Sequence, residues 1–454
     1  MKRIMILSTL LSAWHGGYAQ QPAEVPDSLD AGVLNEVVVE APMQNTTARM
    51  SAYIPGAREK NAAKDAASLL NLMAIPQLSV DPVTDVVKTL SGQPVSIFID
   101  YVEASSEDIS GLNPHDVKRV EYYDNTSDAR FSGKRYVINF IMQKYEWGGY
   151  TKTDATQSFG VIKTDASVYS RMKYKSMSYD IYAGEQYNAV RNAGDESVED
   201  MRFTNLLGNG PANVIRSNFS KTENSHTNTN DISFRAIYDS DKIQLNNRIG
   251  FRYASSPETE TTNNLLYGND WSGSETTRSI SARNNMSARY RGQHLFMLPE
   301  NLTLNIGMSF EYGNNKVNSL YCGSEGTSIT NNAYEKSYSG TINPNLYWSI
   351  DDCHTLRAYA VGAWRDSKID YQGNSSSRQS YKIDGYQAGA SYDFATDSWS
   401  THLNLGWTWQ KNSISNYKFN TSYPRINADV TYSPTQNSQL LASYEYCLLY
   451  TSPS

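Results

Sequence analysis

The chain has 454 residues, of which 39% are hydrophobic and 19% charged, and its formal net charge is −7. After the first 20 residues no run of about 18 apolar residues occurs, which excludes a membrane-spanning helix. The negative net charge argues against a nucleic-acid partner. A chain this polar, with 33 tyrosines, can still occupy a membrane if half of each strand faces water.

The N-terminus has the features of a secretory signal. A basic pair at positions 2–3 precedes an apolar run at 4–14, and the small residues Gly17 and Ala19 follow. This order is typical of cleavage after residue 19. The apolar run is far shorter than the roughly 20 residues that a membrane-spanning helix needs. We therefore expect residues 1–19 to be removed during export.

Residues 20–55 are expected to form a flexible leader, because they are polar and rich in Pro, Ala, Asn and Thr. One apolar island, LNEVVVEA at 34–41, interrupts the leader and favours an extended strand. The island is a candidate docking segment. The alternatives are a linker strand, or the first strand of the domain that follows.

Residues 56–146 are expected to form a compact α/β domain that is long enough to have its own core. The apolar spacing predicts two helices and four strands, which are the helices at 65–73 and 106–112 and the strands at 86–90, 95–100, 117–123 and 136–143.

Residues 147–446 alternate apolar and polar side chains over runs of about ten residues. At 243–253, Ile249 and Phe251 lie on one face and Arg248 and Arg252 on the other; 302–312 repeats the pattern. Such strands are too long for a soluble sandwich and are typical of a transmembrane antiparallel β-barrel. We count about 13 strands, so the predicted fold is mainly β, an incomplete barrel preceded by the small α/β domain.

The connections between these strands alternate between tight and long. Tight turns are predicted at 239–241, 298–301, 351–352, 395–398 and 433–437, and polar loops around 189–226, 254–276, 313–335, 366–380 and 411–418. Short turns on one rim and long loops on the other are typical of an outer-membrane barrel.

The last eight residues, 447–454, break the alternation of the preceding strand. They resemble the in-frame translation of an adapter used in short-read DNA libraries. Together with the odd strand count, this predicts that the genuine sequence ends at about Tyr446 and that the gene continues.

Chemistry-bearing motifs do not appear in this sequence. There is no nucleophile elbow, no phosphate-binding loop and no paired histidine spacing, so we expect no enzyme, no cofactor and no metal site.

The arrangement resembles the TonB-dependent receptor family of the outer membrane, in its Bacteroidetes form. The motifs behind the resemblance are VSIFID at 95–100, LNPHDVKRVE at 112–121, the ARF triplet at 129–131 and VINFI at 137–141. They are similar to the second half of the family's plug domain. Tyr101 departs from the family, which usually has Gly there, and Thr126 stands where Pro is common.

The resemblance implies a plugged barrel that imports a scarce nutrient, such as an iron chelate, cobalamin, an oligosaccharide or a peptide. The island at 34–41 would be the TonB box, with Glu36, Val37, Val38 and Val39 offering a backbone edge to a periplasmic TonB-type protein. The other implied partners are outer-membrane lipid and the nutrient itself, with a surface lipoprotein as a further candidate. The alternatives are a surface adhesin with a vestigial plug and a passive porin.

Two sets of residues are candidates for contacts inside such a receptor. The aromatic residues Tyr267, Trp271 and Tyr321 can stack on a ligand, or they are ordinary girdle and loop residues. Arg130 is a candidate for contact with the substrate or barrel wall, although an ion pair within the plug is the simpler interpretation. Arg248 and Arg252 are expected to face the lumen and contact the plug.

Overall fold

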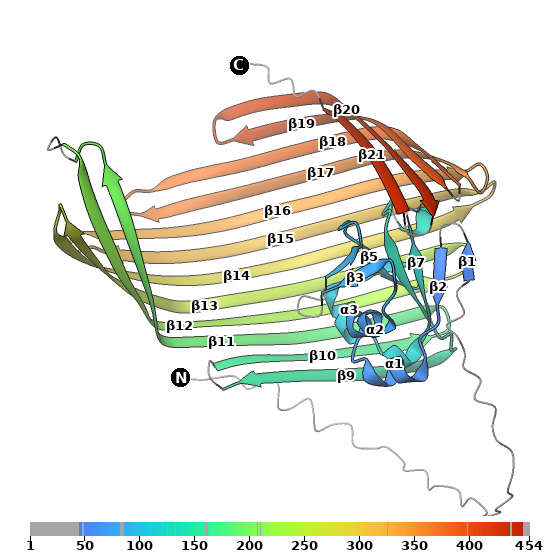
Figure 1. Cartoon of the computed structure of the whole chain (residues 1–454), viewed down its shortest axis with the longest axis horizontal. Helices are drawn as coiled ribbons and strands as arrows, with labels where there is room; N and C mark the ends of the chain where they lie inside the picture. Colours follow the sequence, from blue (N-terminus) through green and yellow to red (C-terminus); the bar gives the residue numbers. More distant parts are fainter. Residues whose placement is uncertain are drawn as a thin grey trace, which may run out of the picture. The chain divides into compact units, whose positions relative to one another are not determined.

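The computed structural model (Figure 1) describes residues 45–447, apart from 48–49, 82–85, 125, 127, 132, 160–161, 207, 209, 325, 397 and 436–437. The predicted signal at 1–19, the island at 34–41 and residues 448–454 therefore lie outside the described residues. Within the described part of the chain, no helix is long and apolar enough to cross a membrane.

The N-terminal α/β domain is built on a six-stranded sheet with the order β1-β2-β7-β8-β5-β6, beside a β3-β4 hairpin. Its strands are β1 (Asn45–Thr47), β2 (Met50–Tyr53), β3 (Leu78–Val80), β4 (Val87–Thr89), β5 (Ser96–Ile99), β6 (Val102–Glu103), β7 (Val117–Tyr123) and β8 (Val137–Met142). Its helices are α1 (Ala57–Ala62), α2 (Ala66–Met73), α3 (Ser106–Gly111) and the 3-10 turns η1 (Pro114–Asp116) and η2 (Ala129–Phe131).

The core of this domain forms where α2 packs on the sheet. Asp65 caps α2 by accepting the Ser68 backbone N–H, and Leu69 and Leu70 on the same helix are buried. Strand β8 pairs with β7 on one side and with β5 on the other, and each of its residues is buried. A central strand that is buried on both faces has a nearly continuous apolar sequence. This is why the sequence predicted a strand at β8.

The domain begins earlier than the sequence indicated. Strand β2 pairs with β7, and Ala52 and Tyr53 are buried in the core. Residues 45–47 and 50–53 therefore belong to the sheet, which corrects the expected leader boundary at residue 55. Only four residues long, β2 carries too little alternation to stand out from a polar leader.

The departure at Tyr101 has a local structural explanation. Asp100 and Tyr101 both have positive φ, at 47° and 65°, in the turn between β5 and β6. A non-glycine residue pays a conformational cost in this region. The Tyr101 ring lies 3.8 Å from the Arg130 guanidinium carbon and packs beside Phe131, and these contacts offset part of that cost.

The remainder of the described chain forms one antiparallel sheet of 13 strands, in chain order from β9 to β21 (Figure 1). The strand count predicted from the sequence is confirmed. The strands are β9 (Trp147–Ser158), β10 (Ile162–Tyr174), β11 (Met177–Phe203), β12 (Ala212–Asp239), β13 (Ile243–Asn269), β14 (Gly273–Leu298), β15 (Leu302–Cys322), β16 (Ser328–Ser349), β17 (His354–Gly373), β18 (Ser377–Ala395), β19 (Trp399–Ile414), β20 (Tyr417–Thr435) and β21 (Ser438–Cys447).

The two faces of this sheet differ, as the alternation predicted. On β13, Ile249 and Phe251 are 61% and 43% exposed on one face. From the other face, Gln244 donates to the Asp100 carbonyl at 3.0 Å and Arg248 reaches α3. The α/β domain therefore contacts the polar face, and the apolar side chains point away from it.

The short turns that the structure describes lie close to their predicted positions, whereas the described parts of the predicted long loops belong mostly to strands. Strands β12 and β13 meet at residues 240–242, and β14 and β15 meet at 299–301. The stretches predicted as polar loops instead continue the strands, so that β11 and β12 stay paired out to Phe203 and Ala212. Long hairpins exposed on both faces lack the apolar alternation that marks a strand in sequence, because backbone pairing alone holds them.

Candidate functional site

The site begins with a short capping motif on α3. Ser105 precedes the helix, and its hydroxyl oxygen accepts the Asp108 backbone N–H. The Asp108 carboxylate accepts the Ser105 backbone N–H at 2.9 Å in return. This reciprocal box fixes the direction of the Asp108 side chain, which is only 1% exposed.

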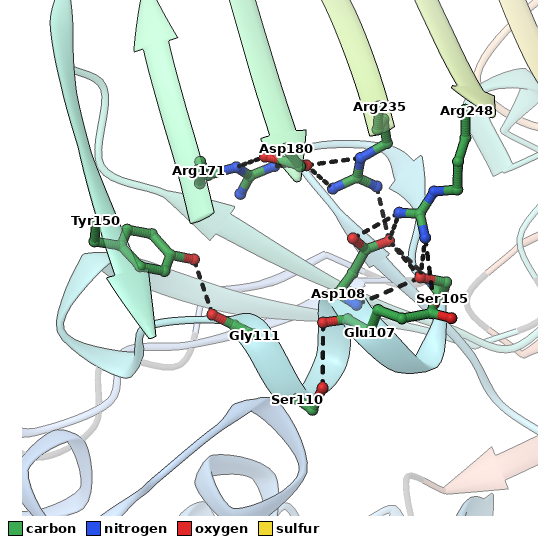
Figure 2. Close-up of polar contacts among 10 residues, drawn as sticks. All are labelled: Ser105, Glu107, Asp108, Ser110, Gly111, Tyr150, Arg171, Asp180, Arg235 and Arg248. Carbon is green, nitrogen blue, oxygen red and sulfur yellow. Dashed lines mark hydrogen bonds and ion pairs between the residues drawn. The ribbon is translucent and has the colours of Figure 1, made fainter. Parts of the chain in front are cut away.

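Two arginines of the 13-stranded sheet bind the Asp108 carboxylate (Figure 2). Arg235 on β12 donates from Nη1 to Oδ2 at 2.7 Å, and Arg248 on β13 donates from Nη2 to Oδ1 at 2.7 Å. Arg248 also donates from Nη1 to Ser105 Oγ at 2.5 Å and to Glu107 at 3.2 Å. One turn of α3 is therefore held by two adjacent strands.

The ion cluster extends along the sheet through Asp180 on β11. Arg235 donates from Nε to Asp180 Oδ2 at 2.7 Å, and Arg171 on β10 donates to Oδ1 at 2.9 Å. The side chains of Arg235 and Asp180 are 3% and 4% exposed. Charges alternate in sign along the cluster, and this is the arrangement in which buried ions offset their desolvation.

The electrostatics of Asp108 follow from this setting. Burial acts to raise its pKa, but the nearby Arg235 and Arg248 guanidinium groups outweigh burial, so the pKa of Asp108 lies below its usual range. Asp108 is therefore ionised at neutral pH, and the attachment between α3 and the sheet is a charged one.

Further contacts between the described parts of the α/β domain and the sheet include single hydrogen bonds and one partly exposed ion pair. The Tyr150 hydroxyl on β9 donates to the Gly111 carbonyl at 3.1 Å, and Asn305 on β15 donates to the Ala129 carbonyl at 2.9 Å. Far along the sheet, Arg135 forms an ion pair with Asp429 on β20 at 2.7 Å. Attachment is thus spread over the sheet, with its buried charges concentrated at α3.

Two cavities flank this attachment. One of about 80 Å³ lies beside Ser105 and Glu107 and is lined by arginines of β13 and β14. The other, of about 440 Å³, lies between the β5–β6 turn at Asp100 and the first sheet strands, with Lys173 and Lys175 in its wall.

The three arginines singled out from the sequence have different surroundings. Arg248 belongs to the cluster at Asp108. Arg252 faces Asp231 on β12 at 3.8 Å, so its ion pair lies within the sheet. Arg130 forms its ion pair with Asp128 at 2.6 Å inside the α/β domain.

The candidate aromatic residues separate into two places. Tyr267 on β13 and Trp271 in the following turn pack edge to face, with ring centroids 4.7 Å apart. Tyr321 lies near the end of β15 and is 38% exposed. Among the described residues, no ring contact joins it to the other two. The candidate docking residues 36–39 lie outside the described part of the chain.

Sequence reasoning missed Asp108, Asp180 and Arg235. The available signal was the S-x-x-D spacing of Ser105 and Asp108, which predicts a helix cap but names no partner. Within the described ranges, no group of His, Cys, Asp or Glu side chains is arranged to hold a metal ion.

No family model matches the chain, and no curated protein matches it. Among solved structures it is similar to the ferric yersiniabactin uptake receptor from Yersinia pestis, with 9% identity, 88% of this chain and 79% of that chain covered, and a TM-score of 0.33. The ferric citrate transporter, in its unliganded form, shares 9% identity over 88% of this chain and 77% of that chain, with a TM-score of 0.29.

The ferric preacinetobactin receptor from Acinetobacter baumannii shares 9% identity over 89% of this chain and 78% of that chain, with a TM-score of 0.29. TM-scores this low do not assign a fold. The architecture therefore stands on the strand order and pairing of this chain, a 13-stranded antiparallel sheet that holds a small α/β domain on its polar face through buried ions.

Proposed function

We propose that the chain is a receptor of the outer membrane, in which the α/β domain plugs a β-barrel and a TonB-type protein supplies the energy for nutrient uptake. The observation that carries the proposal is the buried ion cluster between Asp108 and the polar face of the sheet. In a plugged pore, the plug is expected to bind the polar inner face of the barrel sheet through ions, while the outer face of the sheet is apolar. The α/β domain and the sheet have this arrangement.

The outer face of β19 supports a membrane location. Trp399, Leu403, Leu405, Trp407 and Trp409 are all between 42% and 60% exposed on this face. At ~3.3 Å per residue and a tilt of roughly 40°, the stretch from Trp399 to Trp409 spans about 25 Å. That distance matches the height of the apolar band in outer-membrane barrels, with aromatic residues at both boundaries.

The strand order of the α/β domain supports opening by a pull from the N-terminus. Strand β1 is the edge of the six-stranded sheet, and β2 is next to it. A force applied through the leader would peel these two short strands one at a time, which needs less force than shearing a whole sheet. An extended segment such as Glu36–Val39 can receive that force by adding its backbone to a partner's sheet edge.

Deleting residues 35–40 tests the energy coupling. Uptake should fall to background, while the amount of protein in the outer-membrane fraction stays the same. The control removes six other leader residues, 22–27, and should leave uptake intact. Uptake is followed with a panel of labelled iron chelates, cobalamin, oligosaccharides and peptides, because the class of nutrient is open.

The adhesin alternative makes the opposite prediction. If the 35–40 deletion leaves uptake of every panel member unchanged but cells lose surface attachment when the whole chain is removed, the receptor proposal is wrong. A passive porin would instead be indicated if the chain admits small solutes at the same rate with and without the α/β domain.

A further inference from the structure

The cavity of about 80 Å³ beside α3 has an unusual charge. Its lining contains four arginines, Arg248, Arg252, Arg289 and Arg291. It contains only two carboxylates, Glu107 and Asp231. Glu311, outside the lining, lies 3.4 Å from Arg289 and offsets one further charge. The lining therefore keeps an excess of positive charge in a chain whose net charge is −7.

The strand register explains where the excess lies. Arg235, Arg248 and Arg291 are directly opposite one another on β12, β13 and β14. Like charges in directly opposed positions destabilise a sheet unless anions lie between them. Asp108 binds the first two arginines. Arg291 is exposed, and none of the described residues forms a hydrogen bond or ion pair with its guanidinium group.

A second donor also lacks an acceptor. The Nε atom of Arg289 is buried without a hydrogen-bond partner, because Glu311 lies near it in ion-pair range but not in hydrogen-bond geometry. A buried polar group left unsatisfied is unfavourable, so an acceptor at this position would stabilise the site. Arg289 is opposite Gly250, one row from the pair of Arg248 and Arg291. The guanidinium groups of Arg289 and Arg291, which both have unpaired donors, therefore line the same cavity.

Gly250 gives the cavity its space. It lies between Arg248 and Arg252 on the polar face of β13, and a Cβ atom there would meet other atoms only at 3.8 Å. A larger side chain could thus be accommodated by the backbone, but it would project into the cavity. The site combines guanidinium donors with room for a small group in front of them.

We propose that this cavity binds an oxyanion group, a carboxylate or a phosphate, of the molecule that the receptor takes up. The inference rests on the proposed function for the identity of its ligand. Guanidinium groups recognise both oxyanions by paired, charge-assisted hydrogen bonds. Arg248 lines the cavity and also holds Asp108, so a bound anion competes with the α/β domain for the same side chain.

The test is a calorimetric titration of the full chain, in detergent at low salt, with citrate and with inorganic phosphate as probes. Arg291→Gln should weaken binding about tenfold, because one charged hydrogen-bond donor is lost. Gly250→Leu should abolish binding by filling the cavity without removing an arginine. The stronger of the two probes identifies the preferred oxyanion.

Arg283→Gln is the matched control. Arg283 is exposed on the same strand and the same face as Arg291, roughly 27 Å farther along at ~3.4 Å per residue. Its removal should leave both titrations unchanged. Equal binding in the wild-type, Arg291→Gln and Gly250→Leu proteins would overturn the proposal, and so would the absence of binding of either probe to the wild-type protein.

A second variant tests competition at Arg248. Glu107→Gln removes a carboxylate from the lining, so the anion should bind several-fold more tightly, whereas Glu103→Gln outside the cavity should have no effect. Unchanged affinity in Glu107→Gln would contradict the sharing of Arg248. Failure of these titrations leaves the 35–40 deletion experiment unaffected, so the anion site and the receptor function stand or fall separately.

Discussion

The α/β domain is attached to the sheet in two ways that use the same chemistry in different surroundings. At α3, Asp108 is 1% exposed and lies between Arg235 and Arg248. Near the other end of the sheet, Arg135 and Asp429 form one ion pair whose side chains are 31% and 17% exposed. Both contacts are short, so distance does not distinguish them.

Burial is what makes the two attachments unequal. Removing one partner of a buried ion pair leaves an uncompensated charge and costs about 3–5 kcal/mol, whereas an exposed pair contributes about 1 kcal/mol or less. We therefore expect the α3 attachment to contribute most of the free energy of docking, and the Arg135–Asp429 pair to contribute little. Four changes separate these roles.

Asp108→Asn should have the largest effect. The asparagine keeps the shape but removes the charge, so docking of the α/β domain should weaken by about 3 kcal/mol or more. Trypsin sensitivity of the domain in the detergent-purified chain measures this. Glu103→Gln, which removes an exposed pair with Lys134, is the control. Equal trypsin resistance in both variants would mean that the cluster does not hold the domain.

Acid should act on the same attachment. The folded pKa of Asp108 is below its unfolded value of about 3.9, so its contribution is fully present above that value and is lost as pH falls through the folded pKa. We expect the urea midpoint for releasing the domain to stay level down to about pH 4 and then fall. In Asp108→Asn this part of the profile should be flat; a similar fall there would assign the effect to other carboxylates.

Arg135→Gln should weaken docking by about 1 kcal/mol or less, since its pair with Asp429 is partly screened by water. Trypsin sensitivity should rise only slightly, and added salt should remove most of the difference between variant and wild type. A loss as large as that of Asp108→Asn would reverse the proposed ranking of the two attachments.

Arg130→Gln should not change docking at all. Its ion pair with Asp128 and its contact with the Tyr101 ring are both internal to the α/β domain. The free energy of unfolding of that domain should fall by about 1 kcal/mol, the combined scale of an exposed pair and a cation–π contact. Increased release of a still-folded domain would instead indicate a role at the sheet.

The predicted elements succeeded where local chemistry was sufficient. Alternation located the faces of β13 and β15, and short polar stretches located turns such as the one between Leu298 and Leu302. It also placed Arg248 on the polar face. Prediction failed for β2 and for the long hairpins, because these segments are stabilised by pairing with distant strands rather than by a local apolar pattern.

By itself, the sequence determined the strand periodicity, the tight turns and the polar side of each strand, since these depend on neighbouring residues. Only the tertiary structure decided that Asp108 meets Arg235, 127 positions away, and that Arg235, Arg248 and Arg291 form one row. The reason is register. Pairing sets which side chains are opposite, and it is a property of whole strands that no single stretch of residues encodes.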